Sequence, residues 1–265
     1  MLISVLIFLI SIVPAVLIFI WLRNRHKEDA IYRQNCSYAF KRGLISVLPI
    51  LALSAGLYFL GKVLKATLLQ NAHPLVYKAI YTFIVLAFAE EIVKYITLKK
   101  VLKKKPYAYS WADVTALMVI IGTGFGLIED LPYAIGADPV TMLVRGFTMG
   151  HIGYGFVMGW FYAKHLYTGK KRYSAIAILL PWFVHGLYDF SLSPELLELN
   201  DNFAFLGVSL ALLDIVLLIL MFLYFKRSKH KEIYQSPLTA FACSEQTNRV
   251  ATEAATNSLD NGDNT

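Results

Sequence analysis

Long apolar segments recur along this chain of 265 residues and leave little of it for a water-soluble fold. Apolar residues make up 57% of the sequence and charged residues only 16%, and the mean hydropathy is +0.55. A helix needs about 20 largely apolar residues to cross the hydrocarbon core of a bilayer. Such segments are predicted at residues 2–22, 44–60, 75–98, 112–135, 141–167, 174–192 and 203–225. We therefore predict an all-α, polytopic membrane helix bundle of about seven transmembrane helices.

The charges between these segments predict an orientation. Clusters of Lys and Arg follow the odd-numbered segments, whereas the connections after the even-numbered ones are mostly poor in Lys and Arg or acidic. By the positive-inside rule, the N-terminus lies outside and the C-terminus in the cytoplasm, with the basic residues 23–43 forming a cytoplasmic connection. Residues 1–230 would form the integral membrane domain, and the polar residues 231–265 a disordered cytoplasmic tail. The net charge of +7 is spread over short clusters, so nucleic acid is not an expected partner.

The third segment carries adjacent carboxylates inside a run that is otherwise apolar enough to sit in lipid: Glu90 and Glu91, followed by Lys94. A charge at bilayer depth costs at least about 2.5 kcal/mol, so this pair requires a function or a partner. Helical spacing places Lys94 on the same face as both carboxylates. One ammonium cannot neutralise two carboxylates, and like charges this close favour an acid and a base side by side. The pattern favours a proton-handling or metal-binding site; a structural ion pair is the alternative.

The fourth segment contains the sequence GTGFGLIED, in which Gly122, Gly126 and Glu129 share one helix face. Small residues four apart permit close approach of another helix, so Glu129 is expected to face a neighbouring helix rather than lipid. The glycines superficially suggest a phosphate-binding loop. No strand precedes them and they lie in a membrane segment, so a nucleotide is not an expected ligand.

Histidines lie within the fifth and sixth segments. His151 heads a seam of small residues, and His185 is followed one turn later by Asp189, which can orient the imidazole or bind a metal with it. Counting helix rise puts Glu91, His151 and His185 roughly 12 to 16 Å below the cytoplasmic boundary, near the midplane. The same count puts Glu129 roughly 25 Å deep and therefore farther out. A polar cavity walled by the third to sixth segments is predicted.

These residues leave two functions open. Buried acids and histidines are typical of a hydrolytic site, but they also mark proton or ion pathways in transporters. We find no duplicated halves with interrupted helices, which argues against a transporter. Whether the site binds a metal is also open. His151, His185 and a glutamate would suit a catalytic zinc, while two glutamates and a histidine can activate water unaided.

Four short motifs on successive segments resemble those of the PrsW family of bacterial intramembrane proteases. They are EEIVK at 90–94, FGLIE at 125–129, HIGYG at 151–155 and HGLYD at 185–189. The family is similar in core fold to the type II CAAX prenyl endopeptidases. The resemblance implies a protease of the bacterial plasma membrane that cuts a single-span membrane protein, such as an anti-sigma factor in stress signalling.

The resemblance also implies a catalytic set: Glu90, Glu91, Glu129, His151, His185 and Asp189. One glutamate of the pair, together with His185, would take a proton from water, and the hydroxide would attack the scissile carbonyl. The other carboxylate would protonate the leaving amine, and Lys94 would orient the pair. If zinc is the cofactor, its candidate ligands are His151, His185 and Glu129.

Overall fold

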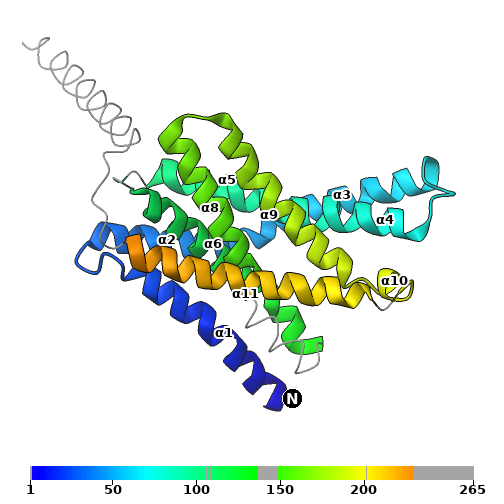
Figure 1. The fold of residues 1–265 in the computed structure, drawn as a ribbon, viewed down its shortest axis with the longest axis horizontal. Helices are drawn as coiled ribbons and strands as arrows, with labels where there is room; N and C mark the ends of the chain where they lie inside the picture. Colours follow the sequence, from blue (N-terminus) through cyan, green and yellow to red (C-terminus); the bar gives the residue numbers. More distant parts are fainter. Residues whose placement is uncertain (1, 106, 108, 137–148, 201, 229–265) are drawn as a thin grey trace, which may run out of the picture.

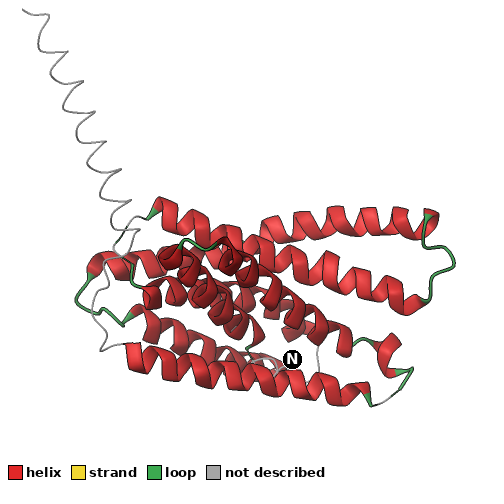
Figure 2. Ribbon diagram, turned by 45° about the horizontal axis from the view of Figure 1, so that its top comes forward, coloured by secondary structure: helices red, strands yellow, loops and turns green. Residues whose placement is uncertain are grey.

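A computed structural model describes residues 2–105, 107, 109–136, 149–200 and 202–228 of the chain. These residues form helices joined by short loops, with no strand among them, as Figure 2 shows. The helices are α1 (Leu2–Arg23), α2 (Ala30–Ile45), α3 (Val47–Thr67), α4 (Pro74–Ile80), the π-helix η1 (Tyr81–Phe88), α5 (Ala89–Lys104), α6 (Trp111–Gly136), α8 (Gly150–Thr168), α9 (Lys171–Ser191), α10 (Pro194–Leu197) and α11 (Phe203–Ser228). The all-α prediction is confirmed. The predicted tail at 231–265 and the start of the fifth predicted segment lie outside the described residues.

α6 is the central helix of the bundle. Every residue from Val114 to Ile121 is fully buried, so α6 is covered on all sides over two turns. It contacts α8 and α2 most extensively, and also α1, α5 and α3. α3 and α4 lead away from this centre as a projecting hairpin, on the right in Figure 1. A helix that is apolar all round requires such surroundings, which places α6 where neighbouring helices can direct polar side chains together.

Glycines let the backbones of α2, α6 and α8 approach one another closely. A Cβ at Gly43 would lie 2.3 Å from the carbonyl oxygen of Ile121, and a Cβ at Gly122 would lie 2.3 Å from that of His151. On the opposite side of α6, Gly124 meets the backbone of α2 in the same way. Real Cβ atoms do not approach backbone oxygens this closely, so only glycine fits. The close approach expected at Gly122 is therefore present, and it brings α6 against the start of α8.

Most of the connection expected at residues 23–43 is helical and forms α2. Asp29 caps it, because the Asp29 carboxylate accepts a 2.9 Å hydrogen bond from the backbone N–H of Tyr32. Tyr32, Cys36 and Ala39 are fully buried at helical spacing. The charged residues around them make the segment polar on average and hide this apolar face, which packs against α6.

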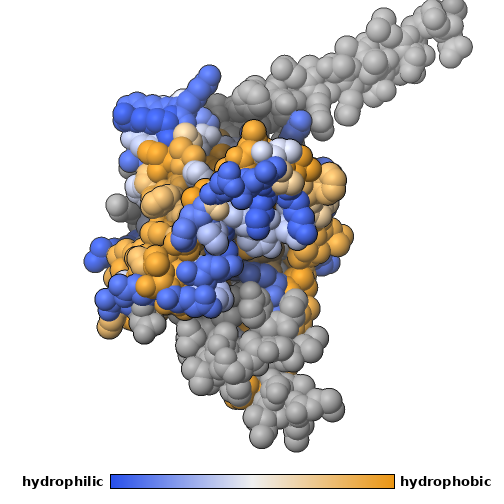
Figure 3. Space-filling view, turned by 90° about the vertical axis from the view of Figure 1, so that its right-hand side faces the viewer, coloured by the Kyte–Doolittle hydropathy of each residue, from blue (hydrophilic) through white to orange (hydrophobic). Residues whose placement is uncertain are grey.

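The outer surface suits a bilayer. Among the residues that the structure describes, three helical stretches are long and apolar enough to cross a membrane: Ala30–Thr67, Trp111–Leu131 and Phe203–Ser228. Large apolar side chains are exposed on α3 and α11; Phe59 is 72% exposed and Phe205 is 70% exposed. Figure 3 shows polar residues gathered at the end of the molecule that carries the α3–α4 turn and α10, with apolar residues around them. Soluble proteins rarely expose so much apolar surface. The number of spans and the orientation of the termini stay predictions.

We expect Gly43→Ala to lower the free energy of unfolding by about 1–3 kcal/mol, because the added methyl group would force α2 away from α6. Gly56→Ala is the matched control, since nothing lies within 4 Å of its added Cβ. Thermal unfolding in detergent, followed by circular dichroism, compares the two. Equal midpoints would contradict the close packing of α2 on α6.

Candidate active site

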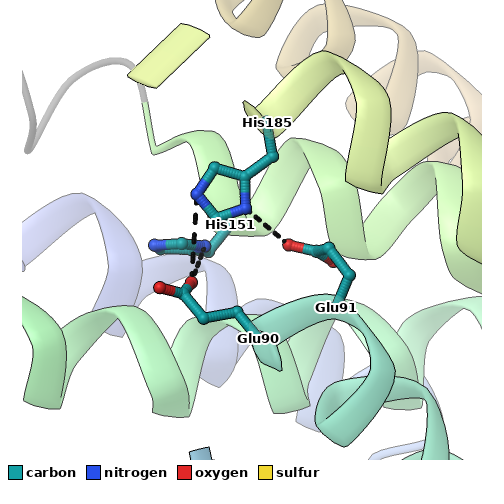
Figure 4. Close-up of side chains that lie close together, drawn as sticks. All are labelled: Glu90, Glu91, His151 and His185. Atoms are coloured by element: carbon teal, nitrogen blue, oxygen red, sulfur yellow. Dashed lines mark hydrogen bonds and ion pairs between the residues drawn. The ribbon is translucent and has the colours of Figure 1, made fainter. Parts of the chain in front are cut away.

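The predicted site residues converge where α5, α6, α8 and α9 meet. Glu90 and Glu91 lie on the first turn of α5, His151 on the first turn of α8 and His185 on α9. Figure 4 shows these four side chains pointing toward one another. One ligand atom from each lies within 4.8 Å of the others. Segments far apart in the sequence thus supply a single polar cluster, as the motif spacing predicts.

A π-helix leads directly into the two glutamates. η1 ends at Phe88, and α5 continues from Ala89 without a break. Two η1 carbonyls accept side-chain hydrogen bonds: that of Phe83 from the Trp182 indole N–H at 2.7 Å, and that of Val85 from the Ser54 hydroxyl at 2.9 Å. Because Trp182 is on α9, one turn before His185, the first bond ties the π-helix to the helix that carries the histidine. π-helical turns are rare and often occur at functional sites.

Glu91 is the most firmly held carboxylate in the cluster. Its Oε1 accepts a 2.6 Å hydrogen bond from Lys94 Nζ and lies 2.9 Å from His185 Nδ1. All three side chains are almost completely buried. Lys94 Nζ also lies 3.1 Å from His151 Nδ1 and 4.8 Å from the centre of the Phe125 ring. The expected Lys94–Glu91 pair is therefore the core of a network that joins α5, α6, α8 and α9.

Glu90 is held much more loosely. Its Oε2 lies 3.9 Å from each of three nitrogens: Lys94 Nζ, His151 Nδ1 and His185 Nε2. That distance is too long for a hydrogen bond, and Oε2 is buried with no hydrogen-bond partner among the described residues. A buried carboxylate oxygen at this distance from three nitrogens leaves room for a small ligand, either a bridging water or a cation.

Each histidine has a second carboxylate on its other side. Glu129 contacts His151 Nε2, and Asp189 Oδ2 lies 3.3 Å from His185 Nε2. Glu129 is closer to His151 than helix-rise counting suggests. A helical side chain leans back toward the N-terminus of its helix, and a Cβ at Gly126 would be 3.4 Å from the His151 ring, so the carboxylate reaches back across a tight crossing.

A cavity of about 70 Å³ opens beside the two histidines. His151, His185, Glu129 and Asp189 all line it, whereas Glu90 and Glu91 do not. Its wall also includes residues that the sequence analysis missed, namely Asp130, Tyr154, Tyr188 and Asp214. Asp214 carried a usable signal, because it is a lone carboxyl in the apolar segment 203–225.

The cluster fits a metal ion. Glu90 Oε2, His151 Nδ1 and His185 Nε2 face a common point, and two imidazoles with one carboxylate are a known donor set of catalytic zinc. The other ring nitrogen of each histidine meets a carboxylate, Glu129 for His151 and Glu91 for His185. Metal-binding histidines are commonly oriented in this way. Two of the described side chains lie against the ring nitrogens that would bind the ion: Asp189 Oδ2 is 3.3 Å from His185 Nε2, and Lys94 Nζ is 3.1 Å from His151 Nδ1. Both would have to turn away from those nitrogens when a metal enters.

Comparison with known proteins identifies the class. Residues 35–226 match the family model described as PrsW family intramembrane metalloprotease. The chain is similar to Protease PrsW of Clostridioides difficile (strain 630), with 26% identity over 71% of this chain and 79% of that protein. It is also 27% identical to Protease PrsW of Shouchella clausii (strain KSM-K16), over 70% of this chain and 82% of that protein. No solved structure matches the chain.

These matches define a membrane-embedded peptide hydrolase. The chain belongs to the PrsW family, because the family model covers most of its length. The resemblance inferred from the four motifs is confirmed, and the protease is supported over the transporter. The family description names a metalloprotease, in agreement with the group of possible ligands Glu90, Glu91, His151 and His185. This group contains both predicted histidines, and Glu129 lies next to it.

We expect Lys94→Met to lower the free energy of unfolding by about 3–5 kcal/mol, because it leaves the buried Glu91 carboxylate without its cation. Adding Glu91→Gln should recover part of that loss, since the amide carries no charge to compensate. Denaturant titration in mixed micelles measures both variants. If the double variant is destabilised by the sum of the losses measured for Lys94→Met and Glu91→Gln alone, the two side chains do not interact.

Proposed function

We propose that the chain hydrolyses a peptide bond of a membrane-bound protein substrate, using water activated at Glu90 between His151 and His185. The observation that carries this proposal is the Glu90 Oε2 atom, which is buried with no hydrogen-bond partner in the described part of the chain and lies 3.9 Å from nitrogens of both histidines. A water at that point would reach the carboxylate and both rings. Glu91 Oε2 is also without a partner among the described residues, but Lys94 and His185 already engage Glu91 through Oε1, so Glu91 serves a different purpose. This assigns the role of base, left open between the two glutamates, to Glu90.

The proposed reaction needs one base and one acid. Glu90 takes a proton from the water, and the resulting hydroxide attacks the scissile carbonyl carbon. The tetrahedral intermediate collapses as the C–N bond breaks, and the proton held on Glu90 passes to the leaving amine. Glu91 holds His185 through Nδ1, and Asp189 meets Nε2, so the ring keeps its orientation throughout. Lys94 keeps Glu91 charged and in place.

The family description names a metalloprotease; if the site binds zinc, Glu90, His151 and His185 would hold it, and Glu90 would be a ligand instead of the base. When bound, zinc supplies a Lewis acid that polarises the carbonyl and acidifies water. With Glu90 engaged in that way, the carboxylates that line the cavity, Glu129 and Asp189, would take over the proton. Substitution of Glu129 or Asp189 should therefore impair the zinc-bound site by removing its proton acceptor, but not the metal-free site.

The substrate that we propose is a single-span membrane protein, with an anti-sigma factor as the leading candidate. The relatives are proteases of bacteria, and the exposed apolar side chains of α3 and α11 suit a lipid environment. The proposed location is the bacterial plasma membrane, crossed by about seven spans with the C-terminus in the cytoplasm.

We expect Glu90→Gln to reduce cleavage of a single-span test substrate by about 10²–10⁴-fold, the usual contribution of a general base. His185→Ala should lose activity comparably. Glu195→Gln is the matched control, because this half-exposed carboxylate pairs with Lys78, away from the site. The measurement is proteolysis by purified protein in bicelles. Full cleavage by Glu90→Gln would refute the role of Glu90, and proton flux in liposomes without cleavage by the wild type would favour the transporter.

Metal dependence is tested separately. A zinc site predicts about one zinc per chain, lost in His151→Ala and His185→Ala, as measured by elemental analysis. In that case a chelator should abolish cleavage, added zinc should restore it, and Glu129→Gln or Asp189→Asn should impair it. Cleavage that survives the chelator, with both cavity-carboxylate variants active, would instead establish the metal-free reaction at Glu90.

A further inference from the structure

The proposed reaction leaves one buried acid unused. Asp214 lies in the middle of α11, in a run that is otherwise apolar, and is 1% exposed. Its Oδ1 is buried with no hydrogen-bond partner among the described residues. A carboxyl group at this depth is costly, and a leucine would fill similar space without that cost. Asp214 also forms part of the wall of the cavity beside His151 and His185, so its position is tied to the site.

The other carboxylate oxygen of Asp214 faces the first turns of α8. Oδ2 lies 3.5 Å from the Tyr154 hydroxyl group, and a Cβ at Gly150 would be 3.2 Å from it. Gly150 is the first residue of α8, and Met149 before it adopts a left-handed conformation, with φ of 46°. That conformation is strained for a residue with a side chain. A carboxylate beside a helix N-terminus is favoured by the helix dipole, so Asp214 stabilises the strained entrance to α8.

Tyr154 connects this acid to the histidines. Its ring stacks on the His185 ring, with centroids 5.2 Å apart and planes 24° apart. It also meets the His151 ring edge-on, with centroids 6.2 Å apart. Tyr154 is itself buried, so the position of its ring is coupled by packing to the two imidazoles that it contacts. The hydroxyl group at the far end of the ring lies 3.5 Å from Asp214 Oδ2, to which it can donate a long hydrogen bond.

We propose that Asp214 is a positioning residue for the hydrolytic site, and that it acts through Tyr154 and the first turn of α8 to fix the His185 and His151 rings. The inference deepens the proposed function and rests on it. Asp214 does not contact the substrate in this role. Its loss should therefore slow the chemical step and leave substrate binding unchanged.

The kinetic test compares Asp214→Leu, Asp214→Asn and Tyr154→Phe with the control Ser209→Ala, an exposed change on the same helix. We expect Asp214→Leu and Tyr154→Phe each to lower kcat by about 10- to 100-fold with KM within about twofold, as expected for misplaced catalytic groups. Asp214→Asn should keep most of the activity, because its amide oxygen can still accept from the tyrosine hydroxyl group. The double variant Asp214→Leu/Tyr154→Phe should be no slower than either single variant.

A second readout needs no activity. The chain has six histidines, and selective ¹⁵N labelling with a His185→Gln variant assigns the His185 signal. We expect that signal to shift in Asp214→Leu and Tyr154→Phe, and to stay unchanged in Ser209→Ala. If the wild type cleaves nothing, the proposed function fails while this spectrum still decides the role of Asp214. Unmoved His185 signals, additive losses in the double variant, or a raised KM with unchanged kcat would each overturn the positioning role.

Discussion

The 2.6 Å contact between the Lys94 ammonium and the Glu91 carboxylate is the interaction on which the arrangement of the site depends. Neither group is exposed, and each would be strongly destabilising alone. Glu91 and Lys94 pair within α5, but Glu91 shares its oxygen with His185 and Lys94 extends the contact to His151. The whole network is therefore complete only when α5, α8 and α9 have docked. Glu90 Oε2, which no described residue hydrogen-bonds, is left to meet a ligand.

Backbone spacing sets how far these side chains must reach. At Gly122 a single methyl group would collide with the His151 carbonyl, and it would push α8 outward together with its imidazole. The π-helix before Glu90 is also fixed in position, because the hydrogen bond from Trp182 to the Phe83 carbonyl ties it to α9, the helix of His185. Close crossings and a shifted helical register thus bring side chains from three helices, α5, α8 and α9, within 4.8 Å.

The physical cost of burying charge explains what could be predicted from the sequence. Glu90, Glu91, Glu129, His185 and Asp189 were visible because each interrupts an apolar segment, and helical spacing paired His185 with Asp189. The packing of α2 in the bundle was not predicted, because charged residues stand between the apolar residues of its buried face and make the segment polar on average. The π-helix depends on tertiary contacts and has no sequence period of its own. Asp214 obeys the same rule as the glutamates, but its partner is an aromatic hydroxyl group on another helix, which spacing along one helix cannot identify.

The size of the cavity limits how a substrate can react. A helix with its side chains is about 10–12 Å across. A cavity of about 70 Å³ is small beside such a helix, which favours an extended segment over an intact helix next to the two histidines. In lipid, the peptide groups of a spanning helix are bonded within the helix, and releasing them costs several kcal/mol each. Polar groups that replace those bonds lower the cost, and under the proposed function Glu129 and Asp189 on the cavity wall would be such groups. Selection of a substrate would then depend on how readily its helix unwinds beside this cavity, more than on the side chains at the cut.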